Sequence, residues 1–222
     1  MFKKHKCESG VSLFSTTSIA KKVLLLLLSL PTVAHADAIQ SLDNFFHSTP
    51  TMRATFHQTV LNKQGVKIQD VTGVMQLQRT GKFRWDYNKP FVRVLVGDGK
   101  KVWLYDSYMN QVTVRAFDKA LGSSPAALLS GIKDLNTIFN LTNSDMQDGL
   151  EWVEATPKDE ESNFELVRLG FKEDTLQKME LHDNRGNTTV IELTHLERNP
   201  KLEPKLFRFK PPAGADVSDE ES

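Results

Sequence analysis

Apolar and polar residues alternate along most of the chain after residue 50. The alternation is clear in segments 54–60, 71–77 and 83–87, and a period of two is typical of strands that bury one face. Further segments of this kind are 91–96, 102–106, 111–116, 151–155, 164–171, 176–182, 188–195 and 206–209. The pattern therefore predicts about eleven strands.

Short turns join many of these strands, for example residues 97–99 and 107–110. Neighbours joined in this way run antiparallel, because a parallel return needs a crossover of roughly a dozen residues or more. Strongly twisted sheets of this many strands seldom stay flat and open. We therefore expect a mainly β protein with short helices, in which an antiparallel sheet curls into a barrel or half-barrel.

A helical pattern precedes the first strand. Ile39, Leu42, Phe45 and Phe46 recur at spacings of three and four residues, which places them on one face of a helix. Pro50 sets a limit to that helix, because proline cannot continue it. The sequence predicts one short amphipathic helix here.

Residues 117–149, between the two groups of strands, lose the alternation. Within them, Ser124 and Pro125 precede the apolar run 126–129. A serine cap followed by proline at the first helical position is a helix-start signal. We expect a short apolar helix in this middle segment.

The inner face of such a curled sheet is expected to be apolar. Its candidate residues are large and lie at alternating positions in the first three strands: Phe56, Met75, Leu77, Phe83, Trp85 and Tyr87. Small barrels are filled by side chains, whereas others hold one ligand. The pattern leaves both a packed core and a dry cavity open.

The first 36 residues resemble a cleavable export signal. Lysines at 21 and 22 precede the apolar run 23–30, and the small-residue site Ala34-His35-Ala36 follows it. The run is shorter than the roughly 20 residues that span a bilayer. We expect residues 1–36 to be a signal peptide and 37–222 a single exported domain. The 22 residues before the apolar run are long for such a signal, so the true start codon could lie further downstream.

Charge and cysteine content narrow the function classes. Cys7, the chain's one cysteine, lies in the leader and outside any lipobox, so we expect neither a lipid anchor nor disulfides. The leader holds five lysines and one glutamate, so the remainder has about four more acidic than basic residues. This balance offers no basic footprint for nucleic acid.

Catalytic and metal-binding patterns are absent from the sequence. The four histidines after the leader, His47, His57, His182 and His195, have no zinc-type spacing. There is no Gly-x-Ser-x-Gly motif for lipase chemistry, and Gly97-Asp98-Gly99-Lys100 lacks P-loop spacing. We expect no enzyme activity, no metal and no cofactor.

Arg79 is the polar exception, at the end of one apolar strand and just before the aromatic positions 83, 85 and 87. By its position alone it could be an ordinary edge arginine or a functional residue.

Several motifs together resemble the LolA family of periplasmic outer-membrane lipoprotein carriers. They are Gln78-Arg79-Thr80-Gly81-Lys82-Phe83-Arg84-Trp85-Asp86-Tyr87, then Val96-Gly97-Asp98-Gly99-Lys100-Lys101-Val102-Trp103-Leu104-Tyr105-Asp106, then Gln111-Val112-Thr113, Leu121-Gly122-Ser123-Ser124-Pro125-Ala126-Ala127-Leu128-Leu129 and Phe207-Arg208-Phe209-Lys210-Pro211-Pro212-Ala213-Gly214. No single motif is a catalytic signature. Their order and spacing cover essentially all of residues 37–222.

The resemblance implies an unclosed antiparallel β-barrel of eleven strands, capped by a helical lid around 117–149 over a hydrophobic cavity. The family receives lipoproteins from an inner-membrane ABC transporter and passes them across the periplasm to an outer-membrane receptor of similar fold. It consumes no ATP. For this chain we accordingly expect a monomer that is not lipid-anchored, with its acyl-binding cavity formed by Phe56, Met75, Leu77, Phe83, Trp85 and Tyr87.

The resemblance also assigns a role to Arg79, that of a latch that donates hydrogen bonds to lid carbonyls in the closed, empty form. The expected lid partners are Leu128 and Leu129. Arginine suits this role because it offers five N–H donors to carbonyls left unpaired at a helix end. Thr80 departs from the family, in which proline often follows the arginine, and this loosens the local φ constraint.

Three other functions compete with the carrier interpretation. The outer-membrane receptor would need a cysteine directly after the leader, where Ala36 and Asp37 stand. An enzyme acting on lipids or cell-wall material would need a nucleophile or an acid–base pair, and no motif supplies one. A related binding module for another amphiphile, such as a glycolipid, stays open.

Overall fold

The computed structural model describes residues 37–88, 90, 92–121, 124–131 and 134–220, all within one compact unit, His35–Ser222. The expected signal peptide and Cys7 lie outside the described residues, as does Phe91 of the predicted strand 91–96. Cleavage after Ala36 therefore stays a prediction. No helix among the described residues is long and apolar enough to cross a membrane.

Within the described residues, a single sheet of twelve strands dominates the fold. The strands are β1 (Thr51–Leu61), β2 (Lys67–Gln78), β3 (Lys82–Tyr87), β4 (Arg93–Asp98), β5 (Lys101–Asp106), β6 (Gln111–Ala116), β7 (Phe139–Gln147), β8 (Leu150–Pro157), β9 (Phe164–Lys172), β10 (Thr175–Asp183), β11 (Thr188–Arg198) and β12 (Asp216–Asp219). Their order is β12-β6-β5-β4-β3-β2-β1-β11-β10-β9-β8-β7. The pairs are antiparallel except β12 with β6, and β7 and β12 are the two ends of an unclosed sheet.

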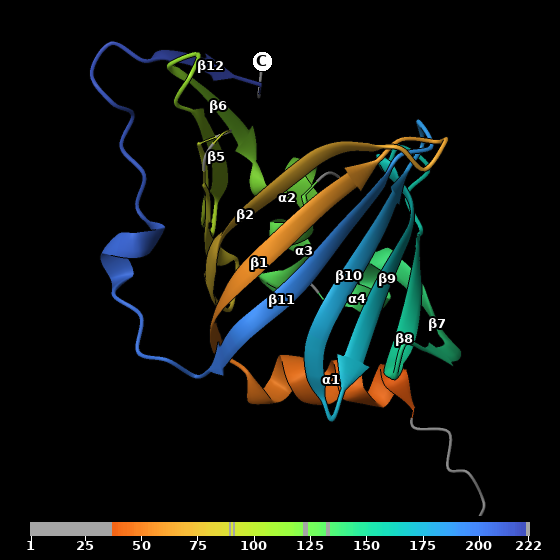
Figure 1. Cartoon of the computed structure of the whole chain (residues 1–222). Coiled ribbons are helices and arrows are strands. Elements are labelled where there is room, and N and C mark those ends of the chain that lie inside the picture. The colour runs from red at the N-terminus through yellow and green to blue at the C-terminus, as the bar shows by residue number, and fades with distance from the viewer. Residues whose placement is uncertain (1–36, 89, 91, 122–123, 132–133, 221–222) are drawn as a thin grey trace, which may run out of the picture. The chain divides into compact units, whose positions relative to one another are not determined.

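Short helices cover the sheet. α1 (Ala38–Ser48) precedes β1, and α2 (Phe117–Leu121), α3 (Pro125–Leu129) and α4 (Leu135–Ile138) follow β6. In Figure 1 the sheet curves around α2, α3 and α4, while α1 lies across one end of the strands. The predicted fold class, a mainly β protein with an unclosed antiparallel sheet and helical cover, is confirmed.

Two local predictions differ from the structure. Residues 206–209 are not a strand: a 3-10 helix, η1 (Pro204–Phe207), occupies this place. Pro204 is suited to a first helical turn because its fixed φ fits and its missing N–H is not needed there. The middle segment is helical only as far as Ile138, and β7 then begins at Phe139.

Edge position explains why β7 and β12 escaped prediction. Most of β7 is exposed on both faces, and all four residues of β12 are exposed. Without one buried face, neither strand has the alternation on which the sequence prediction depends.

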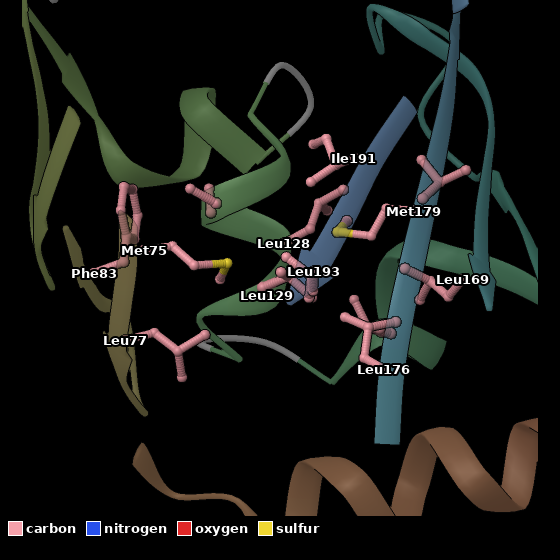
Figure 2. Packing of buried hydrophobic residues seen from close by; sticks show 14 of the residues in the cluster. Met75, Leu77, Phe83, Leu128, Leu129, Leu169, Leu176, Met179, Ile191 and Leu193 are labelled. Carbon is pink, nitrogen blue, oxygen red and sulfur yellow. The ribbon is translucent and has the colours of Figure 1, made fainter. Parts of the chain in front are cut away.

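The core lies on the concave face of the sheet. In β1 the burial pattern alternates strictly through the first eight residues, so that Met52, Ala54, Phe56 and Gln58 face inward. The same period in β2 and β3 directs Met75, Leu77, Phe83 and Trp85 to this side, and all four are buried. Figure 2 shows residues from β2 and β3 facing residues from β9, β10 and β11, with α3 between them.

α1 is fixed to the second half of the sheet by polar and aromatic contacts. The Ser41 hydroxyl donates to Glu151 at 3.1 Å, and the Asn44 amide donates to Asp174 at 3.0 Å. The Phe45 ring packs edge-on against Phe171, with centroids 5.9 Å apart. α1 therefore closes one end of the fold.

Candidate functional site

The short helix α3 fills the concave face of the sheet. The Ser124 hydroxyl accepts a hydrogen bond from the Ala127 N–H and Pro125 stands in the first turn, as the sequence predicts. Ala126, Ala127, Leu128 and Leu129 are all buried. Figure 2 places Leu128 and Leu129 between Met75 and Leu77 on one side and Leu169 and Leu176 on the other. The helix acts as an apolar plug in the curve of the sheet.

The structure brings the six predicted cavity residues together on this face. Phe56, Met75, Leu77, Phe83 and Trp85 are buried, and Tyr87 is half-buried against them. The Phe56 ring contacts Trp85 and Tyr87 edge-on, each with a centroid distance of 5.1 Å.

A glycine makes room for the central ring of this group. A Cβ atom at Gly73 would lie 2.5 Å from the Phe56 ring and 2.1 Å from the Asp86 carbonyl oxygen. A side chain there would therefore displace Phe56 from the sheet. Gly73 is a residue that sequence reasoning did not single out.

The sequence leaves open whether the interior is a packed core or a dry cavity. In the structure the space around α3 is a packed core. The void beside Leu128 and Leu129 measures about 10 Å³, and its lining is entirely apolar. A void of this size has room for about one water molecule at most, because α3 fills the curve of the sheet. A larger space on this face would open only if α3 moved.

Arg79 holds the end of α3. Its Nη1 donates to the Leu129 carbonyl at 2.5 Å and its Nε to the Thr49 carbonyl at 3.0 Å. The guanidinium lies over the Phe46 ring, 3.9 Å from the centroid. Among the described residues, no hydrogen bond joins Arg79 to the Leu128 carbonyl, so of the two expected lid partners only Leu129 is an acceptor. One arginine thus links α1, β2 and α3.

The electrostatics of Arg79 follow from its burial. Removal from water lowers its pKa to about 10, so the guanidinium stays charged at neutral pH. Its Nη2 is buried with no hydrogen-bond partner among the described residues. A charged group with an unmet donor is costly, which makes this contact easier to give up than a fully satisfied one.

Two further contacts complete the junction at Arg79. The Gly81 N–H donates to the Ser130 carbonyl at 3.2 Å, which ties the β2–β3 turn to the end of α3. Gly131 follows with φ +65, and a Cβ atom there would lie 2.8 Å from Arg79 Nη1. A glycine just after an apolar helix is a helix-end signal that could have been used. The Thr49 carbonyl is a backbone group, so the residue type at this position does not indicate its contact with Arg79.

Two pockets flank the plug, near opposite ends of β2. The Arg79 pocket, of about 490 Å³, is lined by Asp43, His47, Arg79, Thr80 and Asp134 among others. The Tyr87 pocket, of about 250 Å³, includes Gln58, Gln69, Tyr87, Arg93, Leu104 and Arg115. Gln69 lies near the start of β2, whereas Arg79 directly follows its end.

Metal chemistry has no support in the described part of the chain, where no group of three or more His, Cys, Asp or Glu side chains could hold an ion. The arrangement is instead suited to binding: an apolar face, a short apolar helix that fills it and one charged side chain at the end of that helix.

Comparison with known proteins identifies the family. Residues 47–210 match the family described as "Outer membrane lipoprotein carrier protein LolA". The chain belongs to the LolA family. The resemblance read from the sequence motifs is thereby confirmed.

Relatives from named bacteria carry a similar description. An "Outer-membrane lipoprotein carrier protein" of Methylobacillus flagellatus is 54% identical over 199 residues, which cover 90% of this chain and 97% of the relative. One of Nitrosospira multiformis is 51% identical and covers 89% of this chain and 96% of the relative. The solved structure of a LolA superfamily protein from Nitrosomonas europaea has a TM-score of 0.46 and 10% identity, covering 78% and 97% of the two chains.

Proposed function

We propose that this protein carries lipoproteins by sheltering their acyl chains on the concave face of its sheet. The observation that carries the proposal is the buried plug: an apolar helix of five residues fills an apolar curve and is retained by one arginine. Membership of the LolA family supports the same conclusion.

The task has a definite size. Exposing an acyl chain to water costs about 0.8 kcal/mol per methylene, which is roughly 12 kcal/mol for a chain of about 16 carbons. A lipoprotein with several chains could not cross an aqueous space unaided at a useful rate. An apolar face that accepts the chains removes this barrier, and no covalent bond has to form or break.

Release requires that the complex is not too stable. When α3 leaves, Leu128 and Leu129 lose contacts worth roughly 1.5–3 kcal/mol each, and the acyl chain takes their place. The free energy of binding is therefore the difference between two apolar fillings. An exchange of this kind lets the protein take up cargo and also release it.

Arg79 sets the balance between the two states. Its hydrogen bond to the Leu129 carbonyl belongs to the closed form alone, so part of the free energy of cargo binding is used to break it. The contact makes the empty, closed protein the stable product after release.

The finer parts of the proposal concern place and partners. We place the protein in the periplasm, without a lipid anchor, after removal of residues 1–36. It would receive lipoproteins from an inner-membrane ABC transporter and deliver them to an outer-membrane receptor of similar fold, acting as a monomer without enzyme activity.

Identification of the natural cargo tests the proposal. The protein is purified from the periplasm, and the molecules that co-purify are analysed by mass spectrometry. Acylated lipoprotein is the expected result. Recovery of a glycolipid alone would contradict the lipoprotein proposal and favour a binding module for another amphiphile.

A variant of Arg79 tests the latch. Arg79→Leu should accept lipoprotein but transfer it poorly to the outer-membrane receptor in a reconstituted assay, because the closed form no longer competes with cargo. The matched control is Arg198→Leu, since Arg198 donates to the Thr49 hydroxyl at 3.0 Å and lies over Phe45, 5.9 Å from its centroid. Efficient transfer by Arg79→Leu, or equal loss in both variants, would contradict the latch role.

A further inference from the structure

The Tyr87 pocket differs in chemistry from the apolar core beside it. At inward-facing positions, β1 continues from Phe56 to Gln58 and β3 from Trp85 to Tyr87. Gln58 is a polar side chain that is only 8% exposed. Along β1 and β3, the inward-facing side chains are therefore apolar beside α3, and they become capable of hydrogen bonding beyond its end.

Strand register brings the polar side chains of this pocket together. Tyr87 pairs with Gly73, which pairs in turn with Phe56, so the tyrosine ring lies beside the Phe56 ring on the concave face. Its hydroxyl donates to Gln58 Oε1 at 3.3 Å. Among the described residues the Gln58 amide nitrogen makes no side-chain hydrogen bond, which leaves its two N–H donors for a ligand.

Donors prevail over acceptors in the lining. Arg93, Arg115, Thr113 and Ser124 contribute further N–H or O–H groups, and the described lining residues include no carboxylate. Asp106 and Glu220, which pair with Arg93 and Arg115, lie outside the lining. The pocket is therefore suited to carbonyl oxygens.

An apolar side chain beside these donors points to an amphiphilic ligand. Leu104 lines the same pocket and is 37% exposed, although it faces the concave side. Trp85, one inward-facing position before Tyr87, buries its indole N–H without a hydrogen-bond partner among the described residues. A carbonyl carried into the core from this side would give that donor an acceptor.

We infer that the Tyr87 pocket binds the polar head of an acylated protein, namely the ester and amide carbonyls that join the acyl chains to the polypeptide. The inference rests on the proposed carrier function and adds the orientation in which the lipoprotein is bound. The acyl chains would lie where α3 lies in the closed form, and the polypeptide would leave by the Tyr87 side.

The Arg79 pocket is a poorer host for the same head, although it is larger. Asp43 and Asp134 line it, and carboxylates repel carbonyl oxygens. This contrast supplies a matched control within one molecule.

Ligand binding by variants tests the inference. The probes are a synthetic diacylglyceryl-cysteine peptide and palmitate, and the measured quantity is the ratio of their affinities. Tyr87→Phe combined with Thr113→Val removes two hydroxyl groups at nearly constant volume. We expect this variant to lower the affinity for the peptide, relative to that for palmitate, roughly tenfold. Asn136→Ala in the Arg79 pocket should leave the ratio of the two affinities unchanged.

Cross-linking gives a second readout that does not depend on affinity. A photoreactive residue in place of Leu104 should capture the lipid-bearing cysteine or its neighbouring residues, and one in place of Asn136 should not. An unchanged affinity ratio, or capture of the peptide from position 136 instead, would overturn the inference while the carrier function stands. If the wild-type protein binds no diacylated peptide, the proposed function itself fails.

Discussion

α1 and α3 are both short helices against one sheet, yet they are retained by different forces. α1 has eleven residues, and its end at Asp37 accepts hydrogen bonds from the N–H groups of Ile39 and Gln40. Side chains of two strands, β7 and β8, and of the β9–β10 turn hydrogen-bond to it. α3 has five residues and is retained by apolar burial and a few contacts at its end.

The difference shows which helix a ligand can displace. Apolar burial is non-directional, so an acyl chain can replace Leu128 and Leu129 with little loss. The polar contacts of α1 are directional, and a hydrocarbon chain cannot replace them. We therefore expect α1 to be a fixed part of the fold and α3 to be its movable part.

Truncation of a ring in α1 should have the largest effect. Phe45 is fully buried against Phe171, so Phe45→Ala should lower the free energy of unfolding by about 3–5 kcal/mol. Urea denaturation measures this loss. Gln40→Ala, on the exposed side of α1, serves as the control and should cost less than about 0.5 kcal/mol. A small loss for Phe45→Ala would mean that α1 is not fixed.

Truncation of the plug should act more locally. Leu129→Ala removes a buried side chain, but we expect a loss of only about 2 kcal/mol, because α3 can detach before the sheet unfolds. Limited proteolysis should cut this variant within 117–138 faster than the wild type, with no new cuts in α1. Resistance of this segment to protease would contradict a movable plug.

A methyl group at Gly131 should disturb the latch without touching the apolar face. Gly131→Ala forces a side chain into a positive φ and against Arg79 Nη1, at a cost of about 1–2 kcal/mol. In the transfer assay it should resemble Arg79→Leu. Gly149→Ala is the control, since φ is +73 there but no atom lies within 4 Å. Normal transfer by Gly131→Ala would show that the contact of Arg79 with the end of α3 does not control the plug.

Removal of the helix caps should change the stability least. Asp37→Ala removes an oxygen that accepts from two N–H groups of α1 and from Asn143 at 2.9 Å, so stability should fall by about 1 kcal/mol. Ser124→Ala removes one longer contact, 3.4 Å, from a helix that opens locally. Thermal denaturation should register the first change more strongly, and a larger effect of Ser124→Ala would reverse our ranking.

Burial on one face explains how much of the fold the sequence could predict. β1 to β6 and β8 to β11 each have a side against the core, and the alternation reveals them. β12 has no such side, and β7 has one only at its start, where Phe139 is buried. The segment 206–209 alternates as a strand would, but Phe207 is buried by η1, which begins at Pro204.

The sequence also predicts only part of the candidate site. Ser124 and Pro125 indicate the start of α3, and the family motifs single out Arg79. The Thr49 carbonyl and the meeting of Gln58 with Tyr87 depend on strand register and on backbone groups. Neither can be read from residue types, because register is set by the whole sheet.

Hydrogen exchange with and without cargo tests the central claim most directly. The protein is compared by mass spectrometry in its empty form and bound to a diacylated peptide. We predict faster exchange for the amides of residues 126–130 in the bound form, because α3 has left the concave face, and unchanged exchange for α1. Equal protection of α3 in both forms, or loss of protection in α1, would contradict the account.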